Sequence, residues 1–102
     1  MHARVWHVRI QAGRTEEFVS ALDSLLPVAR KQPGFRAALV LRTEEGKSPE
    51  ATVIAVYNSQ EDIKASEKNL FLYQAMSKIL SYCEGFPNIR EEAVLLSDFV
   101  KA

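Results

Sequence analysis

The chain alternates between short runs with the two-residue period of a strand and longer runs with the period of a helix. In the first run, Trp6, Val8 and Ile10 share one face, and His7 lies on the other. The predicted strands are residues 3–11, 35–42, 51–57 and 89–99, and the predicted helices are residues 16–31 and 60–84. The order βαββαβ predicts an α+β, ferredoxin-like fold, in which a four-stranded antiparallel sheet carries both helices on one face.

The two helical patterns have recognisable ends. Thr15 and Ser59 are predicted N-caps, because each hydroxyl precedes two acidic residues that suit the positive end of a helix dipole. Pro27 predicts a kink, but the apolar stripe continues past it, so the first helix is treated as one element. The second pattern bends near residues 67–69, and Gly85 predicts its end.

The second and third predicted strands are apolar on both faces. Phe35 shares a face with Leu39 and Leu41, and the third strand has Val53 and Tyr57 on one side with Ile54 and Val56 on the other. Helices on one face of the sheet leave the opposite face uncovered. A second copy of the chain that packs sheet against sheet would bury this apolar surface, so we expect a homodimer.

Composition narrows the class of protein. The 102 residues are expected to form one domain over residues 1–102, and 13 basic and 13 acidic residues cancel, which argues against a nucleic-acid-binding protein. No apolar run is long enough to span a membrane, and the N-terminus lacks the pattern of a signal peptide. With a single cysteine, Cys83, the expected location is the cytoplasm. Residues 44–49 are predicted to form a polar hairpin loop.

Three stretches carry a resemblance to a known family. They are WHVRIQAGRTEEF, QPGFRAALVL and VIAVYNSQEDIKAS, and the resemblance extends over residues 3–99. The chain resembles the antibiotic biosynthesis monooxygenase superfamily. The resemblance implies a dimeric α/β barrel whose pocket lies between helices and sheet. It also implies that the chain is a cofactor-independent monooxygenase acting on a small aromatic or quinol-like molecule.

The resemblance also allows a test for haem degradation. The haem-degrading branch has an asparagine at the position of Trp6, a tryptophan at that of Ser66 and a haem-binding histidine at that of Met76. All three positions differ here. Haem degradation is therefore disfavoured, although a methionine sulfur is itself a weak iron ligand. No cofactor is expected, because the chain has neither a GxGxxG motif nor a P-loop.

The resemblance assigns candidate residues to the pocket. Substrate binding is predicted for Trp6, Tyr57, Ser66 and Met76, and the predicted catalytic residues are His7, Tyr73 and Asn58. Each has a simpler interpretation as well. The large residues suit core packing, Asn58 suits a turn, and alternation places His7 on the face opposite Trp6. The His, Cys and carboxylate residues show no metal-ligand spacing. The alternative function is a non-catalytic small-molecule-binding or assembly domain.

Overall fold

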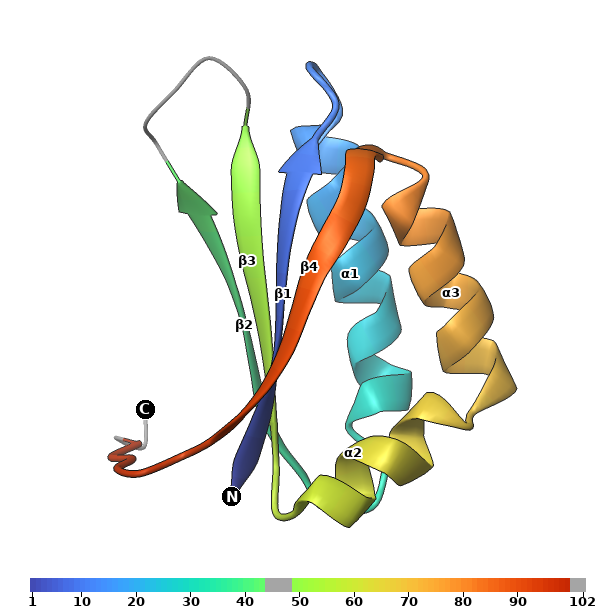
Figure 1. Cartoon of the computed structure of the whole chain (residues 1–102). Coiled ribbons are helices and arrows are strands. Elements are labelled where there is room, and N and C mark those ends of the chain that lie inside the picture. Colours follow the sequence, from blue (N-terminus) through green and yellow to red (C-terminus); the bar gives the residue numbers. More distant parts are fainter. Residues whose placement is uncertain (44–48, 100–102) are drawn as a thin grey trace.

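The computed structural model describes residues 1–43 and 49–99, so the predicted loop at 44–49 lies outside the described residues except for Pro49. The elements of the described part are β1 (His2–Ile10), α1 (Thr15–Ala29), β2 (Phe35–Thr43), β3 (Glu50–Tyr57), α2 (Gln60–Glu67), α3 (Leu70–Leu80) and β4 (Cys83–Ala93) (Figure 1). No helix in these two ranges is long and apolar enough to cross a membrane.

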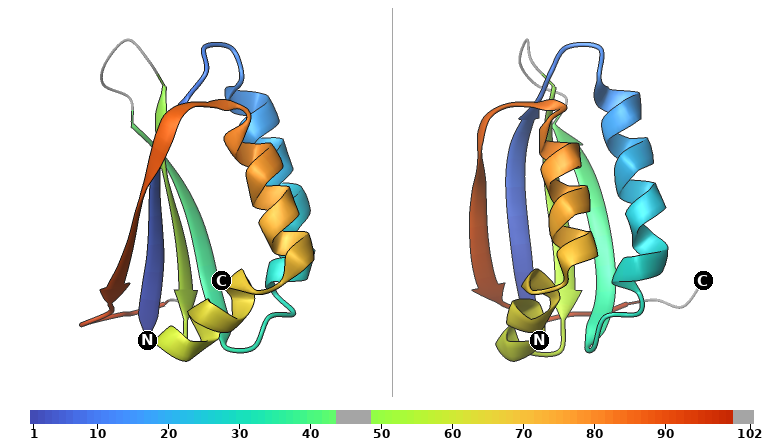
Figure 2. Two further views of the ribbon diagram at one scale, coloured as in Figure 1. Left: turned by 45° about the vertical axis from the view of Figure 1, so that its right-hand side comes forward. Right: turned by 90° about the vertical axis from the view of Figure 1, so that its right-hand side faces the viewer.

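The strands form one antiparallel sheet in the order β2-β3-β1-β4. All helices lie on one face of it, with α1 and α3 side by side (Figure 2). The predicted ferredoxin-like α+β fold is therefore confirmed. The central strands β1 and β3 pair along their whole length, from His2 with Tyr57 to Arg9 with Glu50.

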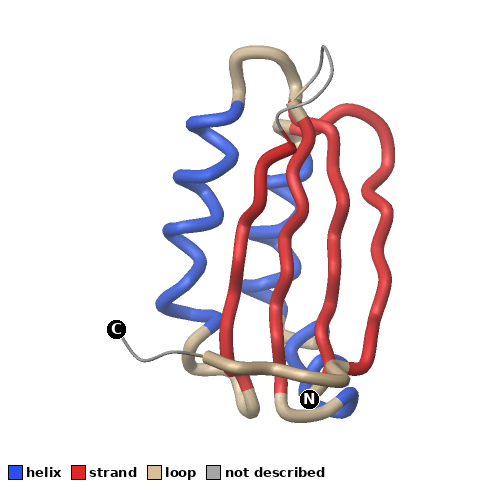
Figure 3. Tube along the Cα trace, turned by 90° about the vertical axis from the view of Figure 1, so that its left-hand side faces the viewer, coloured by secondary structure: helices blue, strands red, loops and turns tan. Residues whose placement is uncertain are grey.

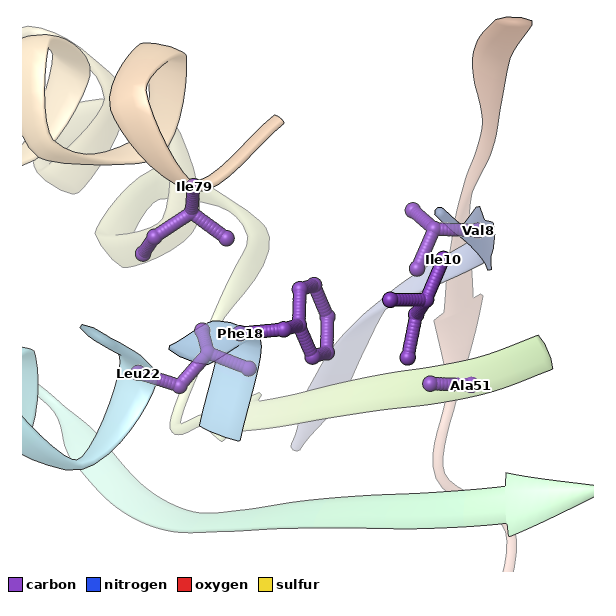
Figure 4. Packing of buried hydrophobic residues seen from close by; sticks show 6 residues of the cluster. All are labelled: Val8, Ile10, Phe18, Leu22, Ala51 and Ile79. Carbon is purple, nitrogen blue, oxygen red and sulfur yellow. The ribbon is translucent and has the colours of Figure 1, made fainter. Parts of the chain in front are cut away.

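The core fills the end of the layer between sheet and helices where α1 begins. Phe18 of α1 is 1% exposed and lies among apolar residues of both layers (Figure 4). The other members of this cluster are Val8, Ile10, Leu22, Ala51 and Ile79. Phe18 and Leu22 are one helical turn apart, as the predicted stripe of the first helix requires.

Helix α1 remains one element through Pro27, as predicted. The prediction that Thr15 caps it is wrong. Thr15 is the first helical residue, and the cap position belongs to Arg14, whose side chain makes no capping hydrogen bond. In the preceding turn the Arg14 N–H donates to the Gln11 carbonyl at 3.0 Å. This turn ends at Arg14, so the helix begins at Thr15, one residue earlier than predicted.

The second helical pattern divides into α2 and α3 at the predicted bend. Ser59 caps α2, as predicted, by accepting a hydrogen bond from the Asp62 N–H at 3.2 Å. Asn69 caps α3 in the same way through the Leu72 N–H at 3.0 Å. Because two separate capped helices form, the inward face of α3 carries Leu72 and Ile79, whereas Leu70 points outward and is 68% exposed.

The last strand begins six residues earlier than predicted, at Cys83 instead of Ile89. Gly85 and Pro87 do not follow a helix but lie inside β4. Pro87 is tolerated there because β4 is an edge strand, where a missing N–H need not break a ladder. The pairing shifts between His7 and Arg9, which indicates a bulge opposite Val8.

A second irregularity, in β2, changes the predicted faces of that strand. Phe35 pairs with Tyr57 but Ala37 pairs with Val56, so the chain bulges between them. Phe35 therefore faces the helices, while Leu39 and Leu41 face the other side. The prediction that these three residues share a face is wrong, because a bulge reverses the alternation that a regular strand would keep.

The sheet face away from the helices is open except where the chain after β4 crosses it. Residues 94–99 run across its end nearest the N-terminus, and the Val94 N–H donates to the Met1 carbonyl at 3.0 Å (Figure 3). Leu39 and Leu41 remain 53% and 48% exposed on this face, and Leu95 and Leu96 of the crossing segment are 96% and 90% exposed. We call this surface the open face.

The turn before β2 requires a glycine. Gly34 has a φ of +76°, and a β-carbon there would overlap the Asp62 carboxyl group. Its carbonyl accepts a hydrogen bond from the Asn58 N–H at 2.8 Å, which ties the start of β2 to the end of β3. The Pro-Gly-Phe turn thus places Phe35 beside Tyr57.

Candidate functional site

A pocket of about 700 Å³ lies between the sheet and the helices, next to the core cluster. Its volume is within the range of small-molecule sites, roughly 300–1,000 Å³. The sheet contributes its floor and the helices its walls. The large apolar and aromatic residues that line it include Trp6, Phe35, Val53, Tyr57, Leu72 and Met76.

Aromatic side chains make up much of the sheet side of the pocket. Tyr57 is only 6% exposed, and its ring meets that of Phe35 edge to face, with centroids 5.6 Å apart and planes at 81°. Trp6 stands on β1 opposite Val53 of β3. These rings give the sheet side of the pocket an aromatic, apolar lining of the kind against which an aromatic ligand packs.

Two further predicted substrate-binding residues line the pocket from the helices. Met76 of α3 contacts the core and the pocket at once. Ser66 of α2 is 7% exposed, and its hydroxyl donates to the Ile63 carbonyl at 2.7 Å. The structure thus brings all four predicted substrate-binding residues to one cavity. The Ser66 proton is already engaged within its helix, so its oxygen has only acceptor capacity to offer a ligand.

The predicted catalytic residues do not converge. Tyr73 lines the pocket at its rim, where it is 66% exposed. Asn58 is exposed and does not line the pocket. Its place in the turn after β3 matches the simpler interpretation. Of these two residues, only Tyr73 can present its polar group to a ligand in the cavity.

His7 lies on the open face, as strict alternation predicts. Its Nδ1 is 3.2 Å from the Thr52 hydroxyl, and its Nε2 is 3.7 Å from a carboxylate oxygen of Glu50. Arg9 approaches the same Glu50 oxygen at 3.9 Å. The sheet therefore separates His7 from the pocket, and within one chain it cannot act as a base there.

The strongest polar group in the pocket was not among the predicted site residues. Arg4 of β1 and Glu67 at the end of α2 both line the cavity and form an ion pair through Nη1 and Oε1. The Arg4 guanidinium lies 5.3 Å from the centre of the Trp6 ring. A sequence signal for Arg4 exists, because it precedes Trp6 by two residues and so shares its helix-facing side. Glu67 offered none.

Burial lowers the pKa of Arg4, whereas the nearby Glu91 carboxylate and Tyr57 phenol act in the opposite direction. The guanidinium nonetheless remains charged, because the ordinary pKa of an arginine lies far above neutral pH. Its Nε is buried and has no hydrogen-bond partner within the described residues. The pocket therefore combines apolar walls with one partly desolvated cation.

The family model for antibiotic biosynthesis monooxygenases matches residues 1–76 of the 102 in the chain. The chain belongs to this family. The match includes β1, α1, β2, β3, α2 and part of α3, and so contains Trp6, Tyr57, Ser66 and Met76. No curated protein matches the chain.

Several solved structures have the same fold as this chain, although their sequence identity to it is low. A Nitrosomonas europaea protein assigned to the antibiotic biosynthesis monooxygenases is 12% identical, with a TM-score of 0.80 over 92% of this chain and 89% of its own. A variant of SnoaB, a cofactor-independent oxygenase from Streptomyces nogalater, is 14% identical, with a TM-score of 0.80 over 94% of both chains. NE2512 from Nitrosomonas europaea, of unknown function, is 19% identical, with a TM-score of 0.76 over 99% and 95%.

The described part of the chain was also searched for residues that could bind a metal ion. Within residues 1–43 and 49–99, no group of three or more His, Cys, Asp or Glu side chains is placed to hold a metal ion. The pocket is lined instead by the charged side chains of Arg4, Asp23 and Glu67, by the phenols of Tyr57 and Tyr73, and by the hydroxyls of Ser66 and Ser77.

Proposed function

We propose that this protein binds a small aromatic, quinol-like molecule in the pocket between sheet and helices and oxygenates it without a cofactor. The observation that carries the proposal is the pocket itself, which has aromatic walls and places the Arg4 guanidinium beside the Trp6 ring. Membership of the antibiotic biosynthesis monooxygenase family supports the reaction type. The fold shared with SnoaB, itself a cofactor-independent oxygenase, is consistent with it.

In this proposal the protein positions the substrate and sets its electrostatic surroundings. The rings of Trp6, Phe35 and Tyr57 hold a flat aromatic body and exclude water from it. An electron-rich quinol reacts with oxygen more readily once it has lost a proton, and a cation beside the resulting oxyanion stabilises that form. Tyr73 at the rim is the predicted residue placed to hydrogen-bond a ligand hydroxyl.

A second candidate function is binding without catalysis. One observation favours it: His7, the predicted general base, lies across the sheet from the pocket. Haem degradation remains disfavoured by the identities of Trp6, Ser66 and Met76. The absence of a Soret shift when haem is added to the protein would agree with that prediction.

We further propose that the protein forms a homodimer through the open face. The support is the exposure of Leu39 and Leu41, at 53% and 48%, on a strand whose other side faces the helices. Leu95 and Leu96, in the segment that crosses this face, are 96% and 90% exposed. A patch of this kind is unusual on a monomer and is the expected contact of a second copy.

Oxygen uptake tests the reaction. Wild-type protein is supplied in turn with hydroquinones and hydroxylated polycyclic aromatics in an oxygen electrode, and Ala55→Leu, which places a larger side chain into the pocket, is the control. We expect uptake with at least one compound and its loss in the control. If no compound is turned over at high protein concentration while ligands still bind, the protein is a binding protein and the catalytic proposal fails.

A further inference from the structure

The ion pair of Arg4 and Glu67 points to the chemical class of ligand. We infer that Arg4 is the binding group for an oxyanion on an aromatic ligand, and that Glu67 occupies the position of this oxyanion in the empty pocket and leaves when the ligand binds. This inference deepens the proposed function, since it rests on the same pocket and adds what the ligand must carry. None of the residues predicted from the sequence has this role.

The position of Arg4 suits the binding of an anionic ligand. It sits on a central strand, and its side chain is 21% exposed at the floor of an apolar cavity. A cation is costly to keep in such surroundings unless its hydrogen-bonding capacity is used. Among residues 1–43 and 49–99, its buried Nε has no hydrogen-bond partner. The pocket thus retains unused donor capacity on the one group that is suited to a carboxylate or phenolate.

Glu67 is the weaker partner of the pair. Its side chain is 42% exposed at the last residue of α2, so it can turn out to solvent at little cost. Ion pairs of such exposure contribute little to stability. The Glu67 carboxylate therefore pairs with Arg4 while the pocket is empty, and an oxyanion of the ligand takes its place on binding.

The other groups around Arg4 favour an exchange of this kind over simple anion addition. Glu91 pairs with Arg4 across β1 and β4, and its Oε2 accepts a hydrogen bond from Gln60 Nε2 at 3.2 Å. Tyr57 contributes a phenol, and His2 lies two residues before Arg4 on the same strand face. With both carboxylates in place the surroundings of Arg4 carry excess negative charge, so an anionic ligand enters only if Glu67 moves away.

Opposite effects of two substitutions test the inference. Calorimetric titrations at neutral pH compare 2-naphthoate, which is ionised, with the neutral 2-naphthamide. For naphthoate we expect Arg4→Met to weaken binding about tenfold or more. Glu67→Gln removes the internal competitor and should tighten naphthoate binding about two- to fivefold. Naphthamide affinity should change in neither variant by more than about twofold, as expected for an uncharged ligand.

Matched variants separate a direct effect on binding from misfolding and from a general change in charge. Arg4→Lys retains the positive charge and should restore part of the naphthoate affinity lost in Arg4→Met, even if the methionine variant folds poorly. Glu61→Gln removes an exposed glutamate from the same helix outside the pocket and should leave naphthoate binding unchanged. Circular dichroism of each variant checks that it is folded.

The outcomes separate this inference from the proposed function. If both naphthalene compounds bind and Arg4→Met weakens them equally, or if Glu67→Gln weakens naphthoate, the pocket function stands and the oxyanion inference is wrong. If neither compound binds wild-type protein, both fail. The source of the oxyanion is then resolved with 4-nitrophenol, whose ionised form absorbs visible light. Binding of the coloured form with the same dependence on Arg4 assigns phenolates to the site, and its absence restricts the class to carboxylates.

Discussion

The guanidinium of Arg4 lies 5.3 Å from the centre of the Trp6 ring. In the sheet, Arg4 pairs with Ala55 of β3 on one side and with Glu91 of β4 on the other. Arg4 and Trp6 together give the pocket a positive charge and an aromatic wall. Because both residues belong to a central strand, their positions are fixed by pairing on both edges. The site is thus built on a strand that is paired on both sides, as precise binding requires.

Substituting Trp6 should affect the pocket, whereas substituting His7 should not. Trp6→Leu removes an aromatic wall, so we expect about a tenfold loss of affinity for an aromatic ligand. His7→Gln alters only the open face and should leave that affinity within about twofold of wild type. Calorimetric titration of both variants with 2-naphthamide is the measurement. A large loss in His7→Gln with none in Trp6→Leu would contradict the placement of the site.

Of the three glycines that the structure describes, Gly34 should be the costliest to replace. Gly34→Ala meets both a positive φ and the Asp62 carboxyl group, which together cost about 3 kcal/mol. Gly13→Ala has a similar φ of +79° but nothing within 4 Å, so only the backbone term of about 1 kcal/mol applies. Urea unfolding at one protein concentration compares them. Equal losses in both variants would show that the contact with Asp62 is unimportant.

Light scattering tests the proposed dimer. Wild-type protein should have twice the 11.5 kDa mass of one chain. Leu39→Glu places a charge on the open face and should yield monomers, because an unpaired buried charge destabilises an interface. Leu70→Glu, at a leucine of α3 that is 68% exposed, should remain dimeric. A wild-type mass of one chain at micromolar concentration would exclude the dimer.

Cys83 should react slowly with thiol reagents. Burial raises the pKa of its thiol above the ordinary 9.0, so the folded chain holds its proton more tightly than the unfolded chain does. The resulting stabilisation is present below the unfolded pKa and is lost as pH rises through the folded pKa. At mildly alkaline pH, Ellman's reagent should label the native protein severalfold more slowly than the urea-unfolded protein. Equal labelling rates would contradict this burial effect.

The sequence was sufficient for the fold because periodicity and caps agree along most of the chain. Ser59 and the stripe of Phe18 and Leu22 illustrate this agreement. The prediction from sequence was wrong where the backbone departs from regular alternation. The bulge at Phe35 turns that ring toward the helices, and the edge position of β4 tolerates Pro87 inside a strand. Such features depend on pairing partners distant in sequence, which a local pattern does not contain.

The candidate site was predictable only in its apolar part. Trp6 and Tyr57 follow from strand alternation and the family resemblance, and both line the pocket. Arg4 was missed because a charged residue near a terminus is usually solvent-exposed. Glu67 was missed because its approach to Arg4 depends on the angle at which α2 leaves β3, which is a property of the assembled fold.

Fluorescence of Trp6, the only tryptophan in the chain, tests the pocket most directly. The emission is titrated with 1,4-naphthoquinone in wild type, in Ala55→Leu, which fills the pocket, and in Ala65→Leu, at an exposed position of α2 outside it. The account predicts saturable quenching with one site per chain in wild type and Ala65→Leu, and only weak, linear quenching in Ala55→Leu. Saturable quenching of the same strength in Ala55→Leu, or none in wild type, would contradict it.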